Sequence, residues 1–210
     1  MKKYEFTDEK IVFDGRTLHR IRALRDFEYV KKGDLGGFIE KEYNLGHKGN
    51  CWVYDNAKVY DNAHVYDNAR VSDEARVCGN AEVFDCARVF DEARVYGEAE
   101  VYCGAEVYGE AEVYGEAEVY DDARVYDEAR VCGNAEVYGC AKVFGNAKVF
   151  GNAQVYGEAC IYDRARVYGN AQVYGDAHVY GHAKIYGDAC VCWDDWINDN
   201  RRISTREQTR

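Results

Sequence analysis

An aliphatic residue recurs at every sixth position of this chain from Val53 to Val191, without one slip, and this repeat constrains the fold more than any other feature. The residue is Val in every unit except at Ile161 and Ile185. Ala follows four positions later, from Ala57 through Ala189 without exception, so the unit reads Ala-x-Val-Tyr-(Gly/Asp)-(Asn/Glu). A period of six does not return residues to one face of a helix, so the repeat excludes a helical solution.

Each unit predicts a short strand followed by a corner. The Ala and the Val are two positions apart and therefore face the same side of a strand, while the variable residue and the Tyr face the other side. The last two positions are mostly Gly, Asp, Asn or Glu, and among these Gly and Asn above all tolerate turn or left-handed backbone. We therefore expect a four-residue strand and a two-residue corner, with Ala and Val inside.

Strands this short must stack on copies of themselves to pair their backbone groups. With three units per coil, the 24 aliphatic positions from Val53 to Val191 predict about eight coils of 18 residues. The expected fold is all-β: a three-sided parallel β-helix solenoid with a thin core of Ala and Val.

The unit resembles that of the hexapeptide-repeat proteins, over about residues 45 to 192. Their usual pattern places an aliphatic residue first and a small residue four positions later, as here. The chain is most similar to the Val-Tyr-Gly-Asn-Ala type found in bacterial and phage proteins that are often labelled as transferases. The resemblance implies a left-handed coil, which periodicity alone does not, because parallel crossovers are otherwise almost always right-handed.

Three segments are expected along the chain. Residues 1–50 break the period, and Asp14-Gly15 between two strand-like runs predicts a β-hairpin, so this segment is interpreted as a cap on the open end of the solenoid. A partner-binding module is the alternative for the same segment. Residues 51–192 form the hexapeptide-repeat solenoid, and residues 193–210 form a C-terminal cap and tail.

The composition limits the class of protein. The net charge of -11 argues against direct binding of nucleic acid, which requires a basic footprint. No stretch approaches the 18 apolar residues of a membrane span, and the charged first ten residues lack the apolar core of a secretory signal. The nine Cys form no zinc-like pair and are expected to be reduced. We therefore expect a cytoplasmic protein.

Folding the sequence at 18 residues per coil assigns the variable residues to three outward faces. One face is mostly basic and is the candidate anion-binding stripe: Lys58, Arg76, Arg94, Glu112, Arg130, Lys148, Arg166 and Lys184. A second, also partly basic, carries Trp52, Arg70, Arg88, Glu106, Arg124, Lys142, Cys160 and His178. The third is mostly acidic and carries His64, Glu82, Glu100, Glu118, Glu136, Gln154, Gln172 and Cys190.

Stacked like charges are unfavourable unless something compensates for them. One interpretation is that corner carboxylates and Tyr rings provide the compensation, since the corners hold 19 acidic residues and one basic residue, Arg164. The other interpretation is that the basic stripe binds an anion, either phosphate groups or an acidic partner. The Tyr ladders are interpreted as surface aromatics that stiffen the sheet, with a stacking platform for bases or sugars as the alternative.

Reaction chemistry is not evident. The fold resembles that of hexapeptide acyltransferases, which use a His base at a trimer interface, and of γ-class carbonic anhydrases, in which His residues from neighbouring subunits hold a metal. Here the repeat has no inserted loop, and Cys160, His178 and His182 make at most a fragment of a metal site, because metal binding needs three or four ligands. No catalytic residue, metal or cofactor is predicted.

The leading hypothesis is a non-enzymatic β-solenoid scaffold that binds or assembles through its faces or its caps. The first alternative is an acyltransferase-like enzyme acting as a trimer. The second is an acidic mimic of a nucleic-acid backbone, or a protein that sequesters a small anionic ligand. A protein partner and a homo-oligomer, either dimer or trimer, are compatible with the three similar faces.

Overall fold

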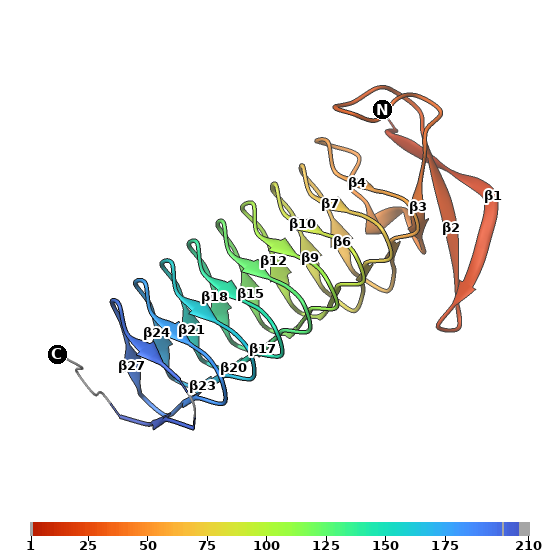
Figure 1. Cartoon of the computed structure of the whole chain (residues 1–210). Coiled ribbons are helices and arrows are strands. Elements are labelled where there is room, and N and C mark those ends of the chain that lie inside the picture. Colours follow the sequence, from red (N-terminus) through yellow and green to blue (C-terminus); the bar gives the residue numbers. More distant parts are fainter. Residues whose placement is uncertain (1, 199, 206–210) are drawn as a thin grey trace.

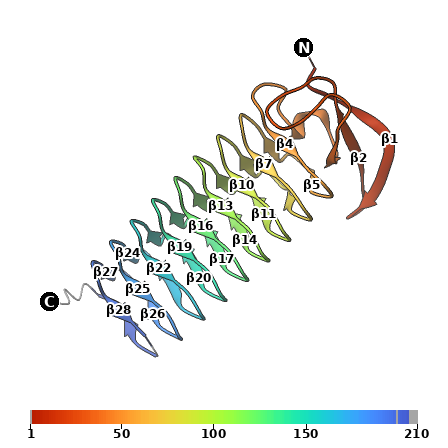
Figure 2. The same cartoon turned by 45° about the horizontal axis from the view of Figure 1, so that its top comes forward.

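The computed structural model describes residues 2–198 and 200–205, and it shows a parallel β-solenoid of about nine turns of roughly 18 residues. Figure 1 shows the coils stacked into a straight prism with a long antiparallel hairpin at the N-terminal end. The turned view in Figure 2 shows that the coils keep the same outline along the whole stack. The hexapeptide repeat therefore forms the solenoid that its period predicts.

The described strands form three sheets, one on each side of the prism. Sheet A has twelve strands, β1 (Tyr4–Phe13), β2 (Arg16–Ala23), β3 (Leu35–Ile39), β5 (Lys58–Val59), β8 (Arg76–Val77), β11 (Arg94–Gly97), β14 (Glu112–Gly115), β17 (Arg130–Gly133), β20 (Lys148–Gly151), β23 (Arg166–Gly169), β26 (Lys184–Ile185) and β29 (Arg202–Ile203). Sheet B has nine, β4 (Trp52–Val53), β7 (Arg70–Val71), β10 (Arg88–Val89), β13 (Glu106–Val107), β16 (Arg124–Val125), β19 (Lys142–Val143), β22 (Cys160–Ile161), β25 (His178–Val179) and β28 (Trp196–Ile197). Sheet C has eight, β6 (His64–Val65), β9 (Glu82–Val83), β12 (Glu100–Val101), β15 (Glu118–Val119), β18 (Glu136–Val137), β21 (Gln154–Val155), β24 (Gln172–Val173) and β27 (Cys190–Val191).

The core is the predicted column of small aliphatic side chains. Every repeat Ala and every repeat Val or Ile from Val53 to Val191 is buried, nearly all of them completely. Backbone hydrogen bonds join each coil to the next, as where Arg88 N–H donates to the carbonyl of Ala105 at 2.9 Å. The predicted inward positions are therefore confirmed, and the predicted outward residues are at least partly exposed except Trp52, Lys58 and Tyr60, which are buried near the N-terminal segment.

The structure adds about one coil to the eight expected, because both ends continue the stack. Ile39 and Leu45 are six residues apart and occupy aliphatic positions of a first coil, but the next aliphatic residue, Val53, comes eight positions later. At the other end, Ile197 and Ile203 keep the period and are buried, although Ala is absent from their units. The repeat is thus longer than its most regular part.

The N-terminal hairpin extends sheet A. Strands β1 and β2 pair in antiparallel fashion around Asp14 and Gly15, both of which have positive φ (49° and 74°), as expected for this turn. Strand β3 then changes the direction of pairing, because it is antiparallel to β2 and parallel to β5. Gly37 in β3 permits this close stacking, since a Cβ there would lie 2.6 Å from the carbonyl oxygen of Ala57.

The segment before the first complete coil covers the end of the core. The side chains of Tyr4 and Phe27 are buried and join the same apolar cluster as Val53. The Phe27 ring packs edge-on against Trp52, with centroids 5.4 Å apart. A short 3-10 helix, η1 (Glu42–Asn44), follows β3.

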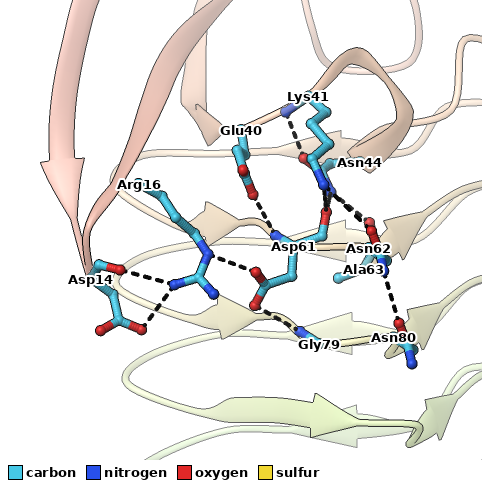
Figure 3. A network of polar contacts seen from close by, with 10 residues as sticks. All are labelled: Asp14, Arg16, Glu40, Lys41, Asn44, Asp61, Asn62, Ala63, Gly79 and Asn80. Atoms are coloured by element: carbon cyan, nitrogen blue, oxygen red, sulfur yellow. Dashed lines mark hydrogen bonds and ion pairs between the residues drawn. The ribbon is translucent and has the colours of Figure 1, made fainter.

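Polar contacts fix the hairpin to the first coils (Figure 3). The Arg16 guanidinium contacts the Asp61 carboxylate at 2.6 Å, and the Asp61 backbone N–H donates to Glu40 at 2.7 Å. The Asn44 amide donates to the Ala63 carbonyl at 2.8 Å. The Arg16–Asp61 contact therefore ties the hairpin to the first coils, and the contacts of Glu40 and Asn44 tie the segment after β3 to them.

Across residues 2–198 and 200–205, no helix has both the length and the apolar character needed to cross a membrane.

Candidate anion-binding surface

The structure places the whole predicted stripe on one ladder of sheet A. All seven basic residues lie in direct register on successive strands, with Glu112 between Arg94 and Arg130. The ladder continues beyond Lys184 to Arg202, whose strand stacks on β26. Their placement agrees with the predicted register, but their environments differ along the stack.

The first two residues of the stripe lie under the hairpin. Lys58 is buried, and its ammonium contacts the Glu74 carboxylate at 2.9 Å. The Phe13 ring lies 5.4 Å from the Lys58 ammonium and 5.0 Å from the Arg76 guanidinium. Lys58 is therefore paired and shielded, and the charge of Arg76 faces an aromatic ring, so neither offers an open site for an anion.

The next two residues neutralise a carboxylate. Arg94 and Arg130 contact Glu112 from the coils on either side, at 3.5 and 3.2 Å. Sheet B repeats this arrangement, with Glu106 between Arg88 and Arg124 at 3.5 and 3.3 Å. A glutamate on one rung therefore compensates for two stacked arginines.

The last part of the ladder lacks such compensation. Lys148, Arg166, Lys184 and Arg202 lie on four successive rungs of sheet A. In the part of the chain that the structure describes, no carboxylate lies within ion-pair distance of any of these four side chains. Four stacked cations repel one another, so this segment gains free energy from any anion that binds across it.

On the same coils, the second residue of the neighbouring corner changes from acidic to basic. Along the edge between sheets B and A, the second corner position is occupied in order by Asn56, Glu74, Glu92, Glu110, Glu128, Asn146, Arg164, His182 and Asn200. The opposite edge of sheet A carries neutral Asn134, Asn152 and Asn170 over much of this stretch, and Asn152 donates to Asn170 at 3.1 Å. Glutamates therefore occupy the second corner position beside the earlier coils of sheet A, whereas Asp163 and Asp188 are the described corner carboxylates that remain beside the last ones.

These residues form one continuous cationic surface, here called the basic patch: Lys148, Arg164, Arg166, Lys184 and Arg202. A hollow of about 500 Å³ in this surface is lined by Arg164, Arg166, His182, Lys184, Asn200 and Arg202. A second, smaller hollow of about 300 Å³ continues from Arg164 and Arg166 towards Glu128 and Arg130. The arrangement places several cationic groups around an open concave surface, which suits an anionic ligand of small size.

The acidic ladder of sheet C is compensated differently, by tyrosine hydroxyls. The hydroxyls of Tyr66 and Tyr102 donate to Glu82 and Glu118, each at 2.8 Å. Burial and the neighbouring carboxylates raise the pKa of Tyr102 above its usual range. Burial, with Glu118 and Glu82 nearby, also raises the pKa of Glu100. The sequence predicted compensation by Tyr rings and corner carboxylates, whereas on this ladder the Tyr hydroxyls contact the carboxylates.

The histidines are dispersed. His64 lies between the rings of Tyr43 and Tyr66, with centroids 4.6 and 4.7 Å away, and His178 stacks on Trp196 at 4.0 Å. Cys160 and His178 are register neighbours, as expected. Of the described residues, no group of three or more His, Cys, Asp and Glu side chains is arranged to hold a metal ion.

Two components of the patch lie outside the predicted stripe. Arg164 is noticeable in the sequence as the one basic corner residue, but nothing in the repeat alone shows that it faces sheet A. Arg202 lies beyond the last complete unit. The aliphatic period continues through Ile197 and Ile203, and this feature would have placed Arg202 on the ladder.

The repeat and its stacked parallel sheets define the class of protein: a β-solenoid repeat protein of the hexapeptide type. Residues 63–79 and 159–175 match the family described as YdcK beta solenoid repeat, and the second segment includes Arg164 and Arg166. Over 63 residues the chain is 40% identical to "Uncharacterized acetyltransferase YdcK" of Escherichia coli (strain K12). This alignment covers 26% of the chain and 19% of that protein, so the chain matches about a fifth of the length of this relative.

Proposed function

We propose that the protein is a rigid binding solenoid whose basic patch holds a small ligand with two or more phosphate groups. The observation that carries this proposal is the run of four uncompensated cations on successive rungs, next to Arg164 at the corner. Arg binds phosphate through two parallel hydrogen bonds and Lys binds it as a point charge. Rungs about 4.8 Å apart place adjacent cations within reach of neighbouring phosphate groups.

The charge of the rest of the molecule favours a small ligand over a long polyanion. The net charge is -11, and the corner beside sheet A carries Glu74, Glu92, Glu110 and Glu128 along the earlier coils. A nucleic acid lying along sheet A would pass these carboxylates and be repelled by them. A di- or triphosphate group would stay within the basic patch.

The shape of the surface favours binding over catalysis. The hollow is open to solvent, and it is lined mostly by long basic side chains. General acid–base catalysis needs an oriented base in a site that limits access of water. The basic patch supplies positive charge on long, flexible side chains, which is sufficient to bind a small phosphate ligand.

Isothermal titration of the purified protein with pyrophosphate tests the proposal. We expect binding that weakens by at least tenfold in Arg166→Gln/Lys184→Gln and weakens as the salt concentration rises. The matched control is Arg88→Gln/Arg124→Gln, which removes the same charge from sheet B and should bind like the wild type. Equal binding by both double variants, or no binding by the wild type, would contradict the proposal.

The name of the E. coli relative favours a second candidate, transfer of an acetyl group. Acetyl-coenzyme A carries phosphate groups that the basic patch would bind, and His182 lines the same hollow as a candidate base. On this reading, the protein releases coenzyme A from acetyl-coenzyme A when an amine or hydroxyl acceptor is present, and His182→Ala abolishes the release. Binding of acetyl-coenzyme A without release of the thiol would support the binding function alone.

A further inference from the structure

A lysine and a cysteine lie buried together where the hairpin meets the first coil. Lys3 and Cys51 are both 0% exposed, and the Lys3 Nζ is 3.0 Å from the Cys51 Sγ. The Lys3 Nζ also donates to the carbonyl of Cys51 at 2.8 Å and lies 3.5 Å from that of Lys48. The Phe27 ring covers the group at 5.3 Å. An amine and a thiol are therefore held in contact, away from water.

Burial favours the neutral form of both groups. Loss of hydration lowers the pKa of Lys3 and raises the pKa of Cys51, although attraction between the charged forms opposes both shifts. A neutral amine has a free electron pair and is a nucleophile, whereas an ammonium is not. Burial thus favours the nucleophilic form of an amine that lies beside Cys51, the one buried cysteine among the described residues.

We propose that Lys3 and Cys51 form a covalent nitrogen–oxygen–sulfur bridge on oxidation by dioxygen. The thiol adds dioxygen to give a hydroperoxide on sulfur. The Lys3 amine then attacks the sulfur-bound oxygen, the oxygen–oxygen bond breaks, and the leaving hydroxide takes the proton of the amine to form water. One amine, one thiol and one dioxygen give one bridge and one water; nitrogen and sulfur each lose two electrons and dioxygen gains four.

The geometry favours a bridge through oxygen over a direct nitrogen–sulfur bond. The 3.0 Å between Nζ and Sγ must shorten by roughly a few tenths of an ångström to fit one bridging oxygen, but by more than an ångström for a direct bond. The surrounding side chains are buried and close-packed, so the smaller movement is the accessible one.

The bridge would attach the start of the hairpin segment to the first coil across 48 residues of sequence. The backbone of Lys3 already accepts a hydrogen bond from Leu24 at 2.9 Å, and its N–H contacts the His47 ring at 3.3 Å. A covalent link there restricts the unfolded chain and prevents the hairpin from leaving the end of the core. The junction would therefore be locked in oxidising conditions and open to separation in reducing ones.

Peptide mapping of the full chain, prepared without oxygen and then incubated in air, tests the bridge. We expect a linked species joining the peptides of Lys3 and Cys51, heavier than their sum by about 14 Da, for one oxygen gained and two hydrogens lost. Trypsin should no longer cut after Lys3 in that species. Treatment with dithiothreitol should restore both the cut and a free thiol at Cys51.

Two variants and one internal standard make the result decisive. Cys51→Ser and Lys3→Arg should each abolish the linked species, while oxidation at exposed Cys86 continues in both. The proposal is overturned if Cys86 oxidises in the wild type while Cys51 stays a free thiol and Lys3 remains cleavable. A linked species about 2 Da lighter than the sum would equally overturn it, since that mass indicates a direct nitrogen–sulfur bond.

Discussion

From Asp55 to Trp193, the first residue of every coil corner has left-handed backbone. Asp91, Asp127 and Asp163 have φ of 58°, 58° and 57°, in a region that most side chains avoid. The carboxylate of Asp127 accepts the backbone N–H of Gly145 on the next coil at 3.1 Å. Asp91 and Asp163 make the same contact with the coils above them. An aspartate at this position therefore both tolerates the corner and ties it to the next one.

Substitution of Asp127 separates these two contributions. Asp127→Gly keeps the left-handed backbone and loses the hydrogen bond, so we expect it to lower the free energy of unfolding by about 1 kcal/mol or less. Asp127→Ala loses the hydrogen bond and also places a Cβ on unfavourable left-handed backbone. We therefore expect it to lower the free energy of unfolding by about 1 to 2 kcal/mol. Urea denaturation of both variants measures the difference. Equal losses would show that the backbone conformation contributes nothing.

The corner residue types were predictable, but their hydrogen bonds were not. Runs of Gly, Asp, Asn and Glu after each Tyr indicate turns, because of their short or absent side chains. In the structure, positive φ occurs at the first corner position, as at Asp61 and Gly79, and at the second only in Gly104 and Asn200 among the described corners. Which corner atoms meet depends on the stacking of whole coils, which a single unit does not specify.

At the scale of the element, a ladder of identical charges is tolerable when each rung has a partner outside the ladder. Sheet C stacks Glu82, Glu100, Glu118 and Glu136 in direct register. Tyrosine hydroxyls from the preceding coil donate to three of these four carboxylates, and Glu100 is the one without such a bond among the described contacts. Glu100 is therefore the weak point of the ladder.

We predict that Glu100→Gln stabilises the protein at pH 7. The pKa of Glu100 is raised in the folded protein, so the folded state holds its proton more tightly than the unfolded state, whose carboxyl titrates near 4.5. The ionised side chain consequently costs stability above the raised pKa, and this cost vanishes once pH falls below the unfolded value. The gain from the substitution should therefore be present at pH 7 and absent at pH 4.

Thermal unfolding at both pH values measures this effect. Glu158→Gln is the matched control, because it removes one carboxylate from a corner outside the ladder. A stabilisation by Glu100→Gln that is equal at pH 7 and pH 4 would contradict the assigned cause, and so would an equal stabilisation by the control.

The period of the sequence predicts which residues stack in the basic ladder, but not which of them other parts of the chain cover. Its register was predictable from residue numbers alone, including the interruption by Glu112. The covering of Lys58 and Arg76 by Phe13 was not, because it depends on how the hairpin folds back over sheet A. Only the part of the stripe far from the hairpin remains open, so the candidate site is smaller than the predicted stripe.

At the scale of the whole molecule, the prism separates its charges along its length as well as around its sides. The first coils of sheet A are covered by the hairpin or flanked by carboxylates, whereas the last coils present the basic patch. The charge of each side was predictable from the period of 18 residues, since this period assigns each outward residue to one ladder. The ends were harder to predict, because Ile39, Leu45, Ile197 and Ile203 continue the coil where the repeat loses its Ala.

A crystal structure of the protein with pyrophosphate, at a concentration above the measured dissociation constant, tests the proposed binding site directly. We expect phosphate groups bound between the side chains of Arg166 and Lys184, with Lys148, Arg164 or Arg202 completing the contacts. Phosphate groups bound to sheet B or to the hairpin, with the basic patch left free in the same crystal, would contradict it.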